Sequence, residues 1–261
     1  MLLLFSSCAN TRTILRSPQT NQQNAYHAMP TLEDERKTAH YVSGTLTIGG
    51  MNDFLRDDIY IFQGRWHVAH QLGTNLQGYF GLNGSAGVYK ISSHSWYEYY
   101  DPLNGSITTY EGPKGNKGTS SLGSTAGLAY AIPLGTKAEW RILGVEGSAG
   151  QEFGSYYKLR KSLPDTLVSL TDRRNFHATL GGFTEFIFKP RNRDIRIGYQ
   201  LAVGSSLHRL RNHYDGWHDF TPYYINNTFH FTVRRTTGSV RIASGKYFAG
   251  VQMGFSYRLS Q

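Results

Sequence analysis

The side chains best suited to catalysis or metal binding gather in one segment near the C-terminus. His213, Asp215, His218 and Asp219 stand within seven residues. Imidazole and carboxylate groups ligate zinc and other transition metals, and a His–Asp pair can also activate a serine nucleophile. The spacing His-x-Asp-x-x-His-Asp matches no metal motif, so the segment is expected to be a solvated loop with no metal and no cofactor. These four residues remain the only catalytic candidates.

Motifs that would identify an enzyme are missing. The chain has no Gly-x-Ser-x-Gly, no His-Glu-x-x-His and no Gly-x-x-x-x-Gly-Lys-Ser/Thr sequence. The sequence therefore favours a protein that is not an enzyme. The alternative is a lipid-modifying enzyme, an acyltransferase or hydrolase, that uses the His and Asp side chains of this loop.

A second group of side chains favours binding. An aromatic and acidic run, Trp-Tyr-Glu-Tyr-Tyr-Asp, occupies residues 96–101. Aromatic rings of this kind stack on sugars or dock a partner protein, although a long loop can also pack them against itself. The candidate binding residues are Trp96, Tyr97, Tyr99, Tyr100 and Trp217.

The elements that position these groups are strands with a period of two. In residues 195–207, for example, Ile197, Leu201 and Val203 share one face, and Arg196 and Gln200 share the other. Such alternation is typical of a strand with one apolar and one polar face. Eight segments fit the pattern: 40–49, 58–71, 75–90, 119–133, 137–152, 175–188, 194–208 and 246–259. Most are long enough to cross a bilayer as tilted strands.

The connections between these segments sort by length. Tight turns near residues 73, 135 and 191 alternate with the long connections 91–118, 153–174 and 209–245 and with the intermediate connection 50–57. Short turns on one side and long loops on the other are typical of outer-membrane barrels. The sequence predicts an all-β, antiparallel, up-and-down transmembrane β-barrel, with both termini on the periplasmic side.

Two segments complicate this prediction. The phase of the alternation changes at Ile142 and Leu143, which predicts a β-bulge. Residues 223–243 also alternate around a turn at 236–238. We interpret them as an outer hairpin, which gives eight strands; if both arms cross the membrane, the barrel has ten.

The polar faces carry charged residues that we expect inside the barrel. They are Arg65, Glu185, Arg196 and Arg258. A lumen eight strands wide has room only for packed side chains. The four residues are therefore predicted to form an internal ion-pair network that plugs the lumen.

Composition agrees with a barrel and excludes several other classes. The 261 residues include one cysteine, 29 glycines and 18 tyrosines, with a net charge of +9 and a mean hydropathy of −0.43. A single cysteine excludes a disulfide framework, and no run of 18 apolar residues forms a membrane helix. The cations are scattered, so nucleic acid is not an expected partner.

The start of the chain resembles a lipoprotein signal. Phe5-Ser6-Ser7-Cys8 is similar to the lipobox of bacterial lipoproteins, and the resemblance implies that Cys8 is lipidated; the alternative is a free cysteine. Residues 1–8 then form a signal remnant, the polar stretch 9–39 a flexible tether, and 40–261 the barrel.

The barrel itself resembles small outer-membrane barrels of the OmpA/OmpX type. With the Ser-Ser-Cys start and the ending Gly-Phe-Ser-Tyr-Arg-Leu at residues 254–259, it is most similar to barrel lipoproteins of Bacteroidota. The resemblance implies a bacterial outer-membrane location.

The function expected from this reading is structural or binding, carried out by the outer loops. Expected partners are outer-membrane lipid, lipopolysaccharide, a glycan or a protein of the cell envelope. Besides the enzyme, a soluble, surface-anchored barrel with a ligand cavity remains an alternative.

Overall fold

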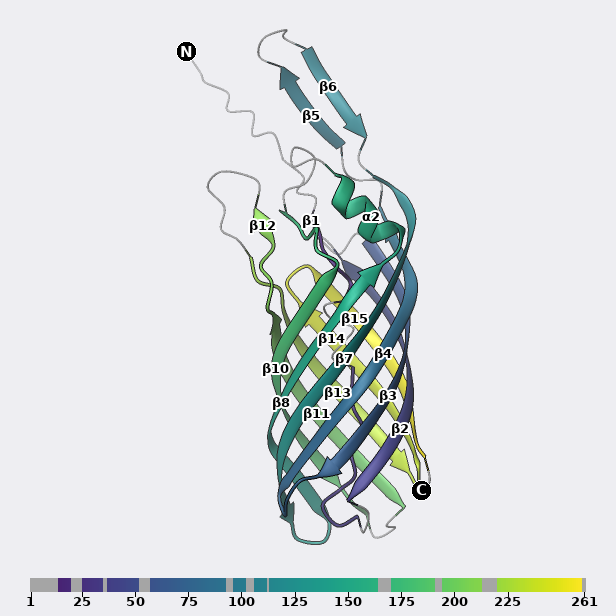
Figure 1. Cartoon of the computed structure of the whole chain (residues 1–261), viewed down its shortest axis with the longest axis vertical. Coiled ribbons are helices and arrows are strands. Elements are labelled where there is room, and N and C mark those ends of the chain that lie inside the picture. The colour runs from purple at the N-terminus through teal and green to yellow at the C-terminus, as the bar shows by residue number, and fades with distance from the viewer. Residues whose placement is uncertain are drawn as a thin grey trace.

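The fold was analysed in a computed structural model, shown in Figure 1. The structure describes residues 14–19, 25–34, 37–51, 57–92, 96–101, 106–111, 113–163, 170–190, 194–212 and 220–259. Within these ranges, no helix combines the length and apolarity needed to span a membrane.

Ten antiparallel strands form a closed barrel. Each strand pairs with the barrel strands before and after it in the chain, and β15 pairs with β2 to close the wall. The wall strands are β2 (Thr38–Met51), β3 (Asp57–Gln71), β4 (Leu76–Ile91), β7 (Gly115–Leu134), β8 (Ala138–Phe153), β10 (Phe176–Phe188), β11 (Ile195–Ser206), β13 (Tyr223–Val233), β14 (Thr236–Gly245) and β15 (Phe248–Arg258). The eight segments expected from the alternation are all among them.

The expected count of eight strands is wrong. The arms of the expected outer hairpin are β13 and β14, which pair along their length with β11 and β15 as parts of the wall. Most of residues 209–245 is therefore barrel strand and not outer loop. The turn between the arms is tight because Arg234 adopts a positive φ of 54°.

The smaller elements gather at one end of the barrel, called here the loop end (Figure 1). They are the hairpin β5 (Trp96–Asp101) and β6 (Ser106–Glu111), the helix α2 (Ser155–Ser162), and a small sheet of β1 (Ile14–Leu15), β9 (Leu170–Thr171) and β12 (Arg211–Asn212). The opposite end, called here the turn end, carries the short connections after β3, β7, β10 and β13 and the end of β15. The predicted sorting holds for the connections after β4, β8 and β11, which are long and lie at the loop end. Two loop-end connections are short: residues 52–56 between β2 and β3, and residues 246–247 between β14 and β15.

The two faces of the wall differ as the alternation predicts. On β11, Ile197 and Val203 are about half exposed, whereas Gln200 and Ala202 between them are buried. The predicted bulge is also present: Ile142 is skipped in the pairing of β8 with β7 and with β10. It keeps both Ile142 and Leu143 on the outer face, where they are exposed.

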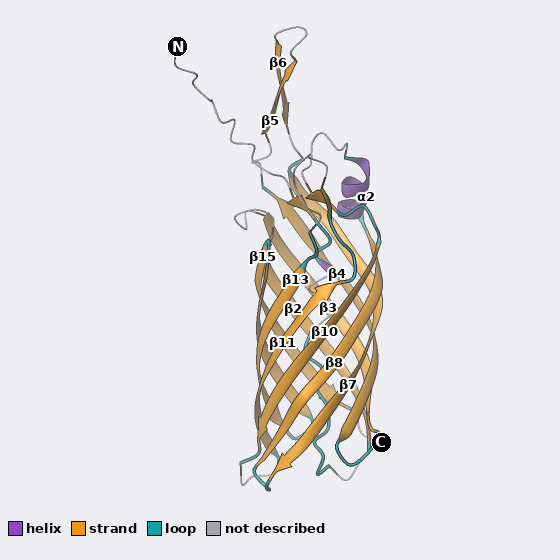
Figure 2. Cartoon of the chain, turned by 90° about the vertical axis from the view of Figure 1, so that its left-hand side faces the viewer, coloured by secondary structure: helices purple, strands orange, loops and turns teal. Residues whose placement is uncertain are grey.

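The N-terminal segment differs most from the expectation. Residues 9–39 were expected to be a flexible tether outside the fold, but their described parts, 14–19 and 25–34, are mostly buried. The segment lies inside the barrel, where Figure 2 shows loop between the front and back walls. Because barrel diameter grows with strand number, ten strands leave space for an extended chain that eight would not.

Candidate functional site

The candidate site is the barrel lumen together with residues 14–19 and 25–34, called here the lumen segment. Three inward side chains of the wall bind its backbone. Arg65 Nη1 donates to the carbonyl of Ala25 at 3.0 Å, and His67 Nε2 contacts the carbonyl of Ala28 at 2.8 Å. Gln77 Nε2 donates to the carbonyl of Pro30 at 2.8 Å. An extended chain has no internal partners for these carbonyls, so the wall supplies them.

Arg141 holds the same part of the segment and also anchors a buried charge cluster. Its Nη2 donates to Pro30 O at 2.9 Å. Its Nη1 lies 2.5 Å from Glu185 Oε2, and its Nη2 lies 3.5 Å from Glu139 Oε1; all three side chains are fully buried. Glu139 in turn accepts a hydrogen bond from the Leu32 backbone N–H at 2.8 Å. Such a cluster tolerates burial only because every charge has a close partner.

Glu185 connects this cluster to the lumen segment a second time. Its Oε1 accepts a hydrogen bond from the Tyr26 hydroxyl at 3.0 Å and lies 2.8 Å from His230 Nε2. The Tyr26 and His230 rings stack with centroids 4.6 Å apart. Tyr26 is thus held by both a carboxylate and a ring from the wall.

His27 occupies a separate polar pocket on the other side of the segment. Its Nδ1 lies 3.2 Å from Glu146 Oε2, and its ring stacks on Tyr79 at 4.5 Å. Tyr79 donates a short hydrogen bond to the same carboxylate. Wall and segment therefore share aromatic and charged contacts on both sides.

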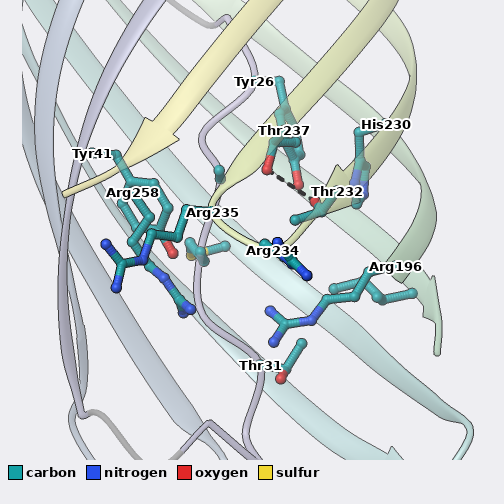
Figure 3. Close-up of a pocket in the computed structure, with 13 residues that line it drawn as sticks. Tyr26, Thr31, Tyr41, Arg196, His230, Thr232, Arg234, Arg235, Thr237 and Arg258 are labelled. Atoms are coloured by element: carbon teal, nitrogen blue, oxygen red, sulfur yellow. Dashed lines mark hydrogen bonds between the residues drawn. The ribbon is translucent and has the colours of Figure 1, made fainter. Parts of the chain in front are cut away.

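At the turn end, two arginines clamp one aspartate of the lumen segment. Arg196 Nη2 lies 2.6 Å from Asp34 Oδ1, and Arg258 Nη1 lies 3.2 Å from Asp34 Oδ2. Burial acts to raise the pKa of Asp34, but the two guanidinium groups outweigh it and hold that pKa below its usual value. Figure 3 shows Arg196 and Arg258 with Arg234 and Arg235 around this mouth of the barrel.

At the loop end the segment is held mainly by packing. Leu15 is fully buried in a cluster of apolar and aromatic side chains. The Arg16 backbone carbonyl accepts a hydrogen bond from the Tyr156 hydroxyl of α2 at 3.1 Å. The Arg16 guanidinium lies over the Phe248 ring.

Gln19 lies below this cluster, in the upper lumen. Its amide nitrogen donates to Thr119 Oγ1 at 3.1 Å, and its amide oxygen accepts from Ser85 at 2.7 Å and Ser121 at 3.1 Å. The two described parts of the lumen segment therefore lie inside the barrel, residues 14–19 toward the loop end and residues 25–34 toward the turn end.

The four residues predicted to form one internal network all point inward, but they do not form a single network. Arg65 binds Gln63 and the segment backbone, Glu185 binds Arg141, and Arg196 and Arg258 meet at Asp34. The plug of the lumen is the N-terminal segment, which these side chains hold.

Sequence reasoning missed several inward charged residues, listed here together: Asp34, Glu139, Arg141, Glu146 and Arg241. For two of them, the sequence contained a pattern that could have identified them. Glu139 and Arg141 alternate with the outward Trp140 on one strand, as inward positions must.

The other predicted site residues cannot be placed in this lumen. Cys8, His213, Asp215, Trp217, His218 and Asp219 lie outside the described residues. Trp96, Tyr97, Tyr99 and Tyr100 belong to β5, whose backbone pairs with β6. Their catalytic, binding and lipidation roles stay predictions. In the described part of the chain, no three His, Cys, Asp or Glu side chains are grouped to hold a metal ion.

Comparison with known proteins yields structural likenesses alone. No protein-family model and no curated protein sequence matches the chain. Among solved structures, the translocator domain of the autotransporter NalP from Neisseria meningitidis matches with a TM-score of 0.44 and 10% identity, over 87% of this chain and 90% of that one.

Two further structures are similar to the same degree. The transport unit of the autotransporter AIDA-I from Escherichia coli has a TM-score of 0.45 and 10% identity, over 93% of this chain and 96% of that one. The COG4313 outer-membrane channel from Pseudomonas putida F1 has a TM-score of 0.42 and 10% identity, over 90% and 98%. These values are too low to transfer any property to this chain.

The architecture itself decides the class. A closed wall leaves no unpaired edge, and its outer face exposes a continuous set of large apolar side chains around a polar interior. Exposure of so large an apolar surface to water is unfavourable, whereas the hydrocarbon core of a bilayer solvates apolar side chains and excludes polar ones. The chain is therefore an outer-membrane β-barrel of ten antiparallel strands.

Proposed function

We propose that this protein is a closed barrel of the bacterial outer membrane that acts as a structural and binding component through its loop end. One observation carries the proposal: the described parts of the lumen segment, 14–19 and 25–34, lie inside the barrel and are bound by wall side chains from Gln19 in the upper lumen to Asp34 at the turn end. A protein built to conduct solutes would need a water path at this place.

The two ends of the barrel support one orientation in the membrane. In outer-membrane barrels the short turns face the periplasm and the longer loops face outward. The connections that hold β5, β6 and α2 therefore face the cell exterior, and the end of β15 faces the periplasm.

Charge at the loop end supports binding of lipopolysaccharide. Among the described residues, six exposed cations stand in connections at this end: Lys114, Lys158, Lys161, Arg174, Arg209 and Lys246. Lys and Arg form charge-assisted hydrogen bonds with phosphate groups, and the outer leaflet presents such groups on lipopolysaccharide. The aromatic run of β5 stays a candidate surface for a glycan or a protein.

Conductance tests the closed lumen. The full chain, reconstituted into a planar lipid bilayer, is expected to show no steady ionic current, whereas a variant that lacks residues 14–34 is expected to conduct. Heat-modifiable migration in SDS verifies that the variant barrel is folded. If deletion prevents folding, replacing Arg65, His67 and Gln77 with Ala loosens the same segment and is expected to give intermittent openings. Steady current through the unmodified protein would refute the proposal.

Binding of purified lipopolysaccharide tests the loop end. The double variant Lys158→Glu with Lys161→Glu is expected to bind at least several-fold more weakly than the unmodified chain. Lys137→Glu changes an exposed cation at the turn end and serves as the control. If the unmodified chain does not bind, or if both variants lose binding equally, the loop end is not the lipopolysaccharide site.

A further inference from the structure

The lumen segment runs through the barrel in one direction, as its contacts with β3 show. This strand starts at the loop end with Asp57 and finishes at the turn end with Gln71. Ala25 contacts Arg65, Ala28 contacts His67, and the Lys37 carbonyl accepts from the Gln71 backbone N–H at 2.7 Å. Later residues of the segment thus meet residues nearer the turn end.

Strand β8, which runs the opposite way, gives the same order independently. It starts at the turn end with Ala138. Leu32 binds Glu139, Pro30 binds Arg141 and His27 contacts Glu146. Earlier residues of the segment therefore lie nearer the loop end on both sides of the lumen.

The start of the segment lies at the loop end itself. Ile14 and Leu15 pair in parallel with Leu170 and Thr171 of β9, and β9 pairs with β12. Both partner strands belong to connections at that end. The distance is also feasible, because residues 14–37 can extend over about 75–80 Å, more than the roughly 65 Å of the twenty-residue β7.

We propose that the barrel carries its own N-terminal segment across the outer membrane and displays the residues that precede Ile14 at the cell surface. The outward direction rests on the orientation proposed above; the passage through the lumen does not. Both ends of the passage are fixed, by the clamp of Asp34 at the turn end and by the β1 sheet at the loop end. The result is opposite to the sequence expectation of a periplasmic N-terminus.

The passage also explains why the lumen contacts are specific. An extended chain that only filled the lumen would need no particular side chain of the wall as its hydrogen-bond or ion-pair partner. Here the wall offers donors to its carbonyls, two guanidinium groups to Asp34, and a carboxylate and a ring to Tyr26. These groups hold the segment at a defined register, which a permanent path for the N-terminus requires.

Surface labelling of an epitope tests the proposal. The same short epitope is inserted into three separate full-length proteins: between residues 10 and 11, between residues 103 and 104 at the loop end, and between residues 192 and 193 at the turn end. Antibody binding is compared between intact and permeabilised cells, after heat-modifiable migration has verified each barrel. The N-terminal epitope is expected to behave like the epitope at 103–104.

The outcomes separate the two proposals. An N-terminal epitope that behaves like the one at 192–193 overturns the passage through the lumen. If instead the epitope at 103–104 is hidden in intact cells and the one at 192–193 is accessible, the outward orientation is wrong. The passage through the lumen is then still supported if the N-terminal epitope is hidden like the one at 103–104, and overturned if it is accessible like the one at 192–193.

A smaller change covers the case in which an insertion blocks folding. Asn10→Cys, Asn104→Cys and Asn192→Cys each introduce one thiol at the same three places. Labelling of each variant is measured as the increase over the unmodified chain, whose one thiol is Cys8. A membrane-impermeant maleimide is expected to label the first two in intact cells and the third only after permeabilisation. Labelling of Asn10→Cys only after permeabilisation, together with Asn192→Cys, overturns the proposal.

Discussion

The outer and inner faces of the same ten strands are built on different rules. Outward side chains such as Ile197, Val203 and Phe229 are apolar and have few specific partners, because lipid accepts any of them. Inward side chains such as Arg141 and Glu185 are charged, fully buried and matched one by one. The outer face therefore determines where the protein resides, and the inner face determines what the lumen holds.

This contrast predicts that tolerance to substitution differs sharply between the faces. On the outer face, only polarity should matter. On the inner face, removal of a single partner should matter even when the replacement is apolar. The predictions that follow test this difference, from the largest expected effect to the smallest.

Replacing Arg141 with Leu is expected to reduce the free energy of unfolding most, by about 3–5 kcal/mol, because it removes the buried guanidinium that Glu185 and Glu139 share and leaves them only His230 and Lys189 as partners. Denaturant titration of the barrel in lipid vesicles measures the loss. Arg234→Ala is the control, since its pair with Asp194 is exposed and such pairs contribute about 0–1 kcal/mol. Equal effects of the two variants would contradict the contrast between buried and exposed charges.

Replacing Phe229 with Arg tests the outer face. Phe229 lies at the middle of β13, is 58% exposed and pairs with Tyr199 and Val240. An arginine near the bilayer midplane is expected to cost about 2–4 kcal/mol, measured by the same titration. Phe229→Leu keeps the polarity and should cost clearly less. A barrel that accepts the arginine without loss would show that this surface does not face lipid.

The clamp at the turn end supplies a pH-dependent effect. At neutral pH, Asp34→Asn is expected to lower the free energy of unfolding by about 1.5–3 kcal/mol, the range for hydrogen bonds to charged groups. The pKa of Asp34 is lower in the folded protein than in the unfolded chain, where it is about 3.9. Its contribution is therefore complete above about pH 4 and is lost as the pH falls through the folded-state pKa.

Unfolding titrations of the unmodified chain and Asp34→Asn between pH 7 and strongly acidic pH measure this contribution. The two proteins should converge in acid. A constant difference at every pH would mean that Asn disturbs packing instead of removing a charge.

Much of the wall could be predicted from the chain. The alternation in residues 195–207 predicted which side chains of β11 face lipid, and the change of phase at Ile142 predicted the bulge of β8. The same alternation was visible at Phe229, Phe231 and Val233, but it was assigned to a hairpin outside the membrane. Alternation shows that a segment is a strand with two unlike faces, and it does not show which strand becomes its neighbour.

The contents of the lumen could not be predicted in this way. Residues 25–34 have no strand alternation, and they belong to the stretch 9–39, whose Asn, Gln, Thr, Ser and Pro content is typical of a tether. Their partners lie far away in the chain: Arg141 binds Pro30 across 111 residues, and Arg258 binds Asp34 across 224. No local pattern encodes such contacts.

The sequence by itself determined that this chain forms a membrane barrel, because the period of a strand is local and its two faces must meet lipid and interior. Only the tertiary structure decided that the wall closes with ten strands and that the N-terminal segment fills it. Closure depends on the pairing of β15 with β2, and the filling depends on charges that meet only once the barrel has formed.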